Sequence, residues 1–160
     1  MSKSDLTTYL NDHLAGSVAA LELLDHLVEM KAGTPDEAFF ASVRSEVTAG
    51  QDALRDLLKR LDEDESTVRK ATAWIVEKLM RVKLQLSGPG NPDMGLFEAL
   101  EGLVLGISGQ CALWRVLAAL DPVPVWKTID FAAWEKRAEN LAQRVEERRV
   151  AVARVALSLP

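Results

Sequence analysis

Apolar residues recur every three or four positions along five long stretches of this 160-residue chain. That spacing places them on one face of an α-helix, because an α-helix turns once in about 3.6 residues. No stretch alternates apolar and polar residues over a useful length, as a half-buried β-strand would. The pattern predicts five helices: Asp5 to Ala32, Thr34 to the acidic run 62–65, Ser66 to Leu86, Asp93 to Leu120, and Thr128 or Asp130 almost to the C-terminus.

Helix-breaking residues separate these stretches. Gly33 stops the first helix, and the sequence Thr-Pro-Asp-Glu at 34–37 is typical of a capping box with proline in the first turn. Ser-Gly-Pro-Gly-Asn-Pro at 87–92 and Asp-Pro-Val-Pro at 121–124 end the third and fourth helices. Short links between long amphipathic helices favour antiparallel neighbours, so we expect an all-α, up-and-down bundle formed by a single domain over residues 1–160.

Composition and charge exclude several classes of protein. Hydrophobic residues make up 48% and charged residues 27% of the chain, which excludes an intrinsically disordered protein. A net charge of −5 argues against nucleic acid as a partner. A lone cysteine, Cys111, forms no internal disulfide. The longest uncharged stretch, Gly102 to Trp114, has 13 residues, and the polar N-terminus lacks the apolar segment of a signal peptide, so we expect a cytoplasmic protein without a membrane span.

Charge is divided unevenly along the chain. Residues 1–65 carry 14 acidic and 6 basic side chains, whereas residues 66–160 carry 10 acidic and 13 basic ones. The basic stretch 66–86 is either a surface that binds a membrane or a partner, or, as we favour, a solvated face that balances the acidic first half.

Three glycines and four tryptophans need an explanation within the predicted helices. Gly102, Gly106 and Gly109 lie close together on the fourth helix, where each costs up to about 1 kcal/mol relative to alanine. We expect close packing against another helix to account for them, with a role in a site as the alternative. The tryptophans, at 74, 114, 126 and 134, are expected to be large core residues whose N–H groups find partners.

Carboxylates and one histidine form a candidate metal site. Glu22 and His26 are four residues apart and therefore share a helix face. Folding the helices back at their links brings Glu46 and Glu98 to the same level of the bundle. These four side chains are candidate ligands for Fe, Mn or Zn. An exposed, helix-stabilising pair at Glu22 and His26 is the alternative that we favour.

The second histidine lies in a different environment. His13 is on the apolar face of the first helix, where an imidazole must form hydrogen bonds, bind a metal or line a pocket. Most often such a histidine is a core residue with its hydrogen bonds satisfied. Folding the helices back at their links places His13 at the same level of the bundle as Leu54 and Trp74. The alternative to a core histidine is therefore a small-molecule pocket formed by these three residues.

Parts of the sequence resemble a known group. Residues 9–17 and 22–24, with 73–79 and 113–115, resemble a group of small bacterial helical-bundle proteins that is similar to the ferritin-like superfamily. The resemblance implies a four-helix core with one additional helix. Ferritin-like metal proteins use Glu-x-x-His motifs, and this sequence has none, so the resemblance supports the architecture and argues against di-iron chemistry.

These observations lead to one preferred function and two alternatives. We expect a non-enzymatic structural or interaction protein that forms a homodimer and needs no cofactor. The alternatives are a degenerate metal-binding protein with ligands among Glu22, His26, Glu46 and Glu98, and a binding pocket formed by His13, Leu54 and Trp74.

Overall fold

The chain is helical throughout the part that the structure describes. The computed structural model describes residues 3–61, 77, 80–82, 84, 86, 88–120 and 123–158, and none of these residues is in a β-strand. The elements are α1 (Lys3–Met30), α2 (Pro35–Arg60), α4 (Pro92–Ala119), the short 3-10 helix η2 (Pro124–Trp126) and α5 (Phe131–Ala156). The all-α prediction is confirmed, and four predicted helices begin and end within a few residues of their expected bounds. Most of the predicted helix over 66–86 lies outside the described residues.

The turn between α1 and α2 forms at the predicted glycine but with different cap contacts. Gly33 has a positive φ of 75°, which glycine adopts without strain. Its N–H donates to Glu37 Oε2 at 2.7 Å, while the Thr34 hydroxyl donates back to the Lys31 carbonyl at 2.7 Å. The predicted capping box is therefore replaced by a cap in which the glutamate accepts from Gly33 and not from Thr34.

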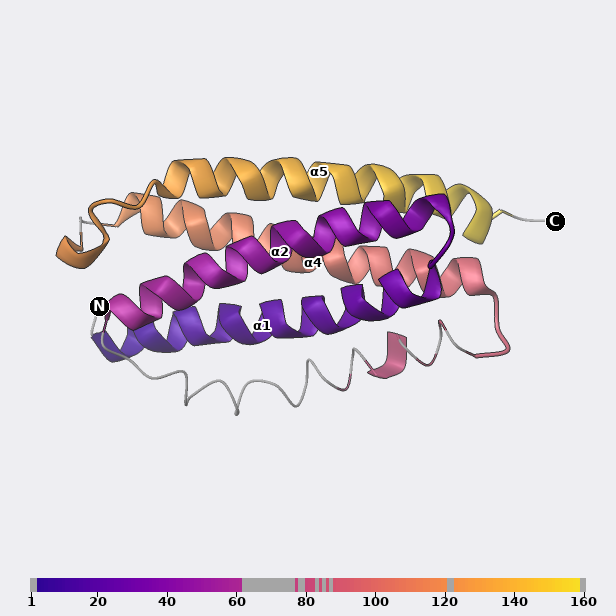
Figure 1. Cartoon of the computed structure of the whole chain (residues 1–160), viewed down its shortest axis with the longest axis horizontal. Helices are drawn as coiled ribbons and strands as arrows, with labels where there is room; N and C mark the ends of the chain where they lie inside the picture. The colour runs from indigo at the N-terminus through magenta and orange to yellow at the C-terminus, as the bar shows by residue number, and fades with distance from the viewer. Residues whose placement is uncertain are drawn as a thin grey trace.

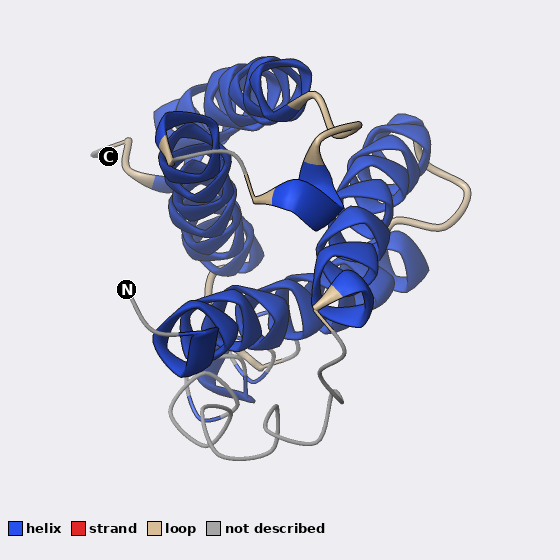
Figure 2. Cartoon of the chain, turned by 90° about the vertical axis from the view of Figure 1, so that its left-hand side faces the viewer, coloured by secondary structure: helices blue, strands red, loops and turns tan. Residues whose placement is uncertain are grey.

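The helices associate as two pairs. α1 lies along α2, and α4 lies along α5, over much of their lengths, whereas α1 touches α4 and α2 touches α5 over shorter stretches. Figure 1 shows the two pairs, with each pair's helices running side by side. In the end view of Figure 2 the four helices surround a central region, and η2 lies against α2 at the end nearest the viewer.

The apolar core is divided into two clusters along the length of the helices. One cluster surrounds Phe40, Leu100 and Val145, and the other surrounds Leu10, Leu54 and Trp114. Trp126 of η2 closes the second cluster: it is 3% exposed, and its Nε1 donates to the Leu57 carbonyl at 3.3 Å. The prediction that the tryptophans are large core residues is confirmed for Trp114 and Trp126, which are both buried. Trp134 is half-buried, and Trp74 lies outside the described residues.

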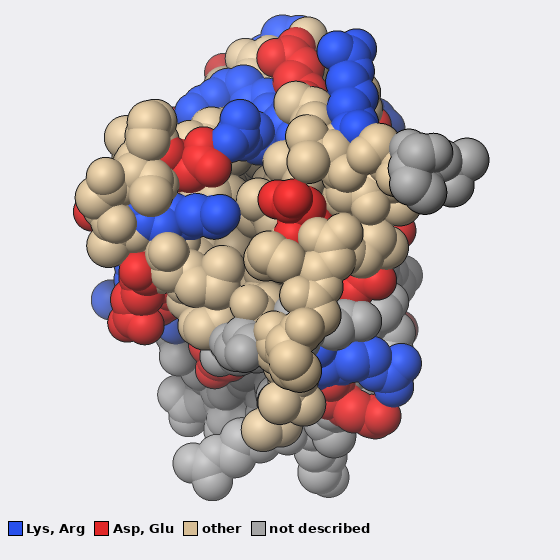
Figure 3. All heavy atoms as spheres, turned by 90° about the vertical axis from the view of Figure 1, so that its right-hand side faces the viewer, with Lys and Arg blue, Asp and Glu red and all other residues tan. Residues whose placement is uncertain are grey.

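Ion pairs join α5 to the acidic first half of the chain. Arg137 binds Glu46 at 2.9 Å, Arg148 binds Asp36, and Arg144 donates to the Ser42 hydroxyl at 2.9 Å. Figure 3 shows acidic and basic side chains lying beside one another over the end of the molecule that holds the α1–α2 turn. The uneven charge of the sequence is thus balanced in part between α2 and α5.

Helix α4 is the most apolar element of the described chain. By length and composition alone it is the one helix among the described residues that is able to cross a membrane, although its longest uncharged stretch is short. In its most apolar 18-residue window, 39% is buried within the protein. The buried face supplies core residues such as Leu100, Leu103 and Trp114, and the other face leaves Leu105 and Val116 exposed.

Candidate functional site

A polar layer crosses the middle of the bundle, between the two apolar clusters. Ser17 of α1, Gln51 of α2 and Gln110 of α4 are 4%, 4% and 9% exposed, respectively. Gln51 Nε2 donates to the Ser17 hydroxyl at 2.9 Å, and this hydroxyl donates to the Leu14 carbonyl at 2.7 Å. Two members of the layer are therefore held by hydrogen bonds within the protein. The third, Gln110, has no hydrogen bond to any described residue in this structure.

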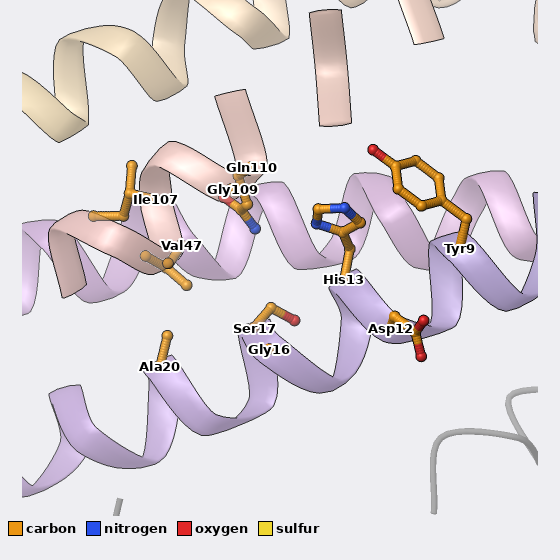
Figure 4. A pocket seen from close by; sticks show the side chains of 11 residues that line it. Tyr9, Asp12, His13, Gly16, Ser17, Ala20, Val47, Ile107, Gly109 and Gln110 are labelled. Carbon is orange, nitrogen blue, oxygen red and sulfur yellow. The ribbon is translucent and has the colours of Figure 1, made fainter. Parts of the chain in front are cut away.

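A cavity opens at the level of this polar layer, between α1 and α4. Its volume is about 430 Å³, which lies within the roughly 300–1,000 Å³ typical of small-molecule sites. The wall comes from three helices and contains Tyr9, Asp12, His13, Gly16, Ser17 and Ala20 of α1, Val47 of α2, and Gly106, Ile107, Gly109 and Gln110 of α4. Figure 4 shows Tyr9 and His13 projecting toward α4 and Asp12 projecting to the opposite side of α1.

Glycines create much of this space. An added Cβ at Gly16, Gly106 or Gly109 would meet no atom within 4 Å. The expectation that Gly102, Gly106 and Gly109 allow close helix packing is therefore wrong, since Gly102 also faces open space. The reason is that α1 and α4 touch over only a short stretch, so Gly106 and Gly109 face a cavity. The alternative, a role in a site, agrees with this placement.

Gly50 of α2 positions the side-chain amide of Gln110. A Cβ on Gly50 would lie 3.2 Å from Gln110 Oε1 and 3.5 Å from Gln110 Nε2. Because Gly50 has no side chain, the Gln110 carboxamide rests directly against α2. This contact holds the Gln110 donor and acceptor at the wall of the cavity.

An aromatic pair forms the polar end of the cavity. The rings of Tyr9 and His13 meet edge to face, with 4.8 Å between their centroids. Burial lowers the pKa of His13 below the ordinary histidine value, and the nearby charge of Asp12 opposes this shift only in part. Burial also raises the pKa of the Tyr9 hydroxyl. Both groups are therefore uncharged near neutral pH.

The structure places the three residues of the predicted pocket differently. His13 lines the cavity and is half-buried, so it is neither a fully enclosed core residue nor a surface one. Leu54 is fully buried in the second apolar cluster and is not part of the cavity wall. Trp74 lies outside the described residues. The walls opposite His13 come instead from Val47 and from α4.

The candidate metal ligands are dispersed over three helices. Glu22 is exposed and His26 is half-buried on α1, and Glu46 is engaged by Arg137. Glu98 is half-buried on α4, beside the 88–91 loop. The described part of the chain contains no group of three or more His, Cys, Asp or Glu side chains able to hold a metal ion together. Metal binding by these residues stays a prediction.

Sequence reasoning overlooked the polar layer, although the sequence carries a signal for it. The apolar residues of α4 follow the spacing Leu96, Leu100, Leu103, Ile107, Cys111 and Trp114, and Gln110 lies beside that series. Ser17 interrupts the corresponding series in α1, and Gln51 lies beside the one in α2. A polar residue at a core position of a helical repeat is a sign of a buried polar contact. Ser17 is such a sign, whereas Gln51 and Gln110 lie beside the apolar series of their helices.

Comparisons with known proteins provide no relative from which to transfer a function. No family model, curated protein or solved structure matches the chain.

Proposed function

We propose that the protein binds a small, largely apolar organic molecule in the cavity between α1 and α4, and that it does so without catalysing a reaction. The observation that carries this proposal is the set of glycines at the cavity wall. Gly16, Gly106 and Gly109 each cost their helix up to about 1 kcal/mol relative to alanine, and no neighbouring atom requires the missing side chain. The absence of side chains at these positions widens the cavity that they line.

Binding is favoured over catalysis by the hydrogen bonds of the wall. The Ser17 hydroxyl donates to the Leu14 carbonyl and accepts from Gln51. Both hydrogen bonds of this hydroxyl are therefore structural. A catalytic serine would instead donate to the imidazole that acts as its base, and Ser17 does not donate to His13. The remaining wall is mostly apolar or glycine, which suits retention of a ligand.

Nile red, an uncharged dye whose fluorescence rises in apolar surroundings, tests this proposal. We expect the dye to bind the full chain, and Gly109→Leu to weaken its affinity about tenfold, or about 1.4 kcal/mol, because the added side chain occupies cavity space. Gly102→Leu is the matched control: it lies on the same helix, also faces open space and is not part of the wall. Fluorescence titration of the three proteins gives the affinities.

Two results would overturn the proposed function. One is the absence of Nile red binding to the unmodified chain. The other is an equal change in affinity for Gly109→Leu and Gly102→Leu, since the dye would then bind a surface and not the cavity. Circular dichroism establishes that each variant is folded.

We also propose the finer architecture expected from the sequence, an up-and-down bundle with a ferritin-like four-helix core. The short turn at Gly33 and the side-by-side pairs α1–α2 and α4–α5 support it. Distances between spin labels placed at the two ends of α1 and α4 test the relative direction of these helices. Short distances between like ends would contradict the arrangement.

A homodimer remains our second proposal for how the protein acts. Leu105 and Val116 on α4 are 64% and 44% exposed, and Val155 on α5 is 62% exposed. Exposed large apolar side chains favour association when they lie on one surface. We expect light scattering at tens of micromolar to give twice the 17.6 kDa chain mass, and Leu105→Lys to reduce it to the mass of one chain. A single-chain mass for the unmodified protein would contradict the proposal.

A further inference from the structure

We propose that the ligand of this cavity is an uncharged planar ring system with a cyclic-amide edge, in which a carbonyl group and an N–H lie side by side, and that this edge pairs with the carboxamide of Gln110. The inference rests on the proposed function and specifies the chemical class of the ligand. Three features of the wall support it: its charge, its shape and its unpartnered polar side chain.

The wall carries little charge. Among its residues only Asp12 bears a carboxylate, and its side chain projects to the far side of α1 in Figure 4. No lysine or arginine contributes to the wall. An anionic ligand would lose its hydration without gaining an opposite charge, which costs several kcal/mol. The cavity therefore disfavours anions, and its one carboxylate is directed away from Tyr9 and His13.

Glycines on two helices leave parts of the cavity wall without side chains. Gly16 comes from α1, whereas Gly106 and Gly109 come from α4, and none has an atom within 4 Å of its missing Cβ. Exposed helix backbone without side chains permits close stacking of a flat ring. The end of the cavity away from Tyr9 is lined by Ala20, Val47 and Ile107, as Figure 4 shows. An apolar ring would make van der Waals contacts with these aliphatic side chains.

Gln110 provides the polar recognition element. Its side chain is more than nine-tenths buried, lies at the cavity wall and has no hydrogen bond to a described residue. A carboxamide presents an acceptor oxygen and a donor nitrogen next to each other. A cyclic amide offers the complementary donor and acceptor in one plane and satisfies both.

Phenanthridinone, a flat three-ring cyclic amide, tests the inference together with two matched analogues. N-methylphenanthridinone has the same rings and carbonyl but no N–H, and phenanthrene carboxylate carries a negative charge. We expect the full chain to bind phenanthridinone about tenfold more tightly than its N-methyl analogue, and the carboxylate more weakly still. Fluorescence titration measures all three affinities.

Two variants assign the preference to Gln110. Gln110→Leu removes the carboxamide and is expected to reduce the preference to within twofold while Nile red still binds. Gln143→Leu, an exposed glutamine on α5, is the control and is expected to leave the preference unchanged. Binding of Nile red without any preference for phenanthridinone would overturn this inference and leave the proposed function intact. Loss of Nile red binding to the unmodified chain would overturn both.

Discussion

Individual residues in the middle of the bundle depart from the rules that govern the rest of the core. Most buried positions of α1, α2 and α4 are apolar, and the buried polar residues of these helices are Thr7, Asn11, Ser17, Gln51 and Gln110. Ser17 and Gln51 satisfy each other, whereas Gln110 retains a free donor and acceptor. Gln110 lines the cavity that we propose as a binding site, and it lies beside the apolar repeat of α4 that continues through Cys111.

His13 makes the stability of the protein depend on pH. Burial lowers its folded-state pKa, so between that value and the ordinary histidine pKa of about 6.5 the unfolded chain binds a proton that the folded chain does not. The free energy of unfolding therefore falls as the pH decreases through this window. We expect His13→Gln to reduce this fall, measured by urea unfolding at several pH values on either side of the window.

The second histidine provides the control for this prediction. His26→Gln removes the other imidazole of the chain and is measured under the same conditions for comparison. If His13→Gln and the unmodified protein lose stability equally on acidification, His13 is not the group responsible.

At the scale of elements, η2 closes one end of the bundle with a single large side chain. Trp126 is buried against α2 through its hydrogen bond to the Leu57 carbonyl and meets the ring of Phe131 edge to face. Arg60 supports the same segment by donating to the Val125 carbonyl at 3.3 Å. Three residues of 3-10 helix thereby cover the ends of α2 and α5.

Removal of the Trp126 ring is expected to be costly. Trp126→Ala should lower the free energy of unfolding by about 3–5 kcal/mol through cavity formation. Trp126→Phe should cost less, because it retains most of the apolar contact and loses a hydrogen bond worth about 1 kcal/mol. Val125→Ala, at the exposed neighbouring position, should change stability by less than about 0.5 kcal/mol. Urea unfolding compares the three, and equal costs at 125 and 126 would show that η2 does not close the core.

At the scale of the whole molecule, the two helix pairs meet through contacts of different kinds. On one side, the contact between α1 and α4, which is less extensive than the contact within either pair, contains the cavity. On the other side, α2 and α5 share core residues and are linked across their surface by the Arg137–Glu46 and Arg148–Asp36 ion pairs. The packing between pairs is therefore less extensive than the packing within each pair.

Surface ion pairs between the helix pairs should contribute little and should respond to salt. Glu46 and Arg137 are 37% and 48% exposed, so a double-mutant cycle with Glu46→Gln and Arg137→Gln should give a coupling of about 0.2–1 kcal/mol. Arg137 also lies over the Trp134 ring, with its Cζ 4.7 Å from the ring centroid. A single substitution of Arg137 would remove this contact together with the ion pair, and the double-mutant cycle separates the two effects. Raising the salt concentration to about 1 M should reduce the coupling, and a coupling insensitive to salt would contradict this account.

The sequence by itself determined the helices. The 3.6-residue period of apolar residues, Gly33 and the proline-containing links set where four of them begin and end, because these signals act within one or two turns of the chain. The cavity depended on tertiary structure. Gly16 of α1 and Gly109 of α4 are far apart in the sequence, and whether a glycine admits a close helix or faces a cavity depends on how near the opposite helix lies. That separation results from the packing of all the side chains between two helix pairs, and no local pattern specifies it.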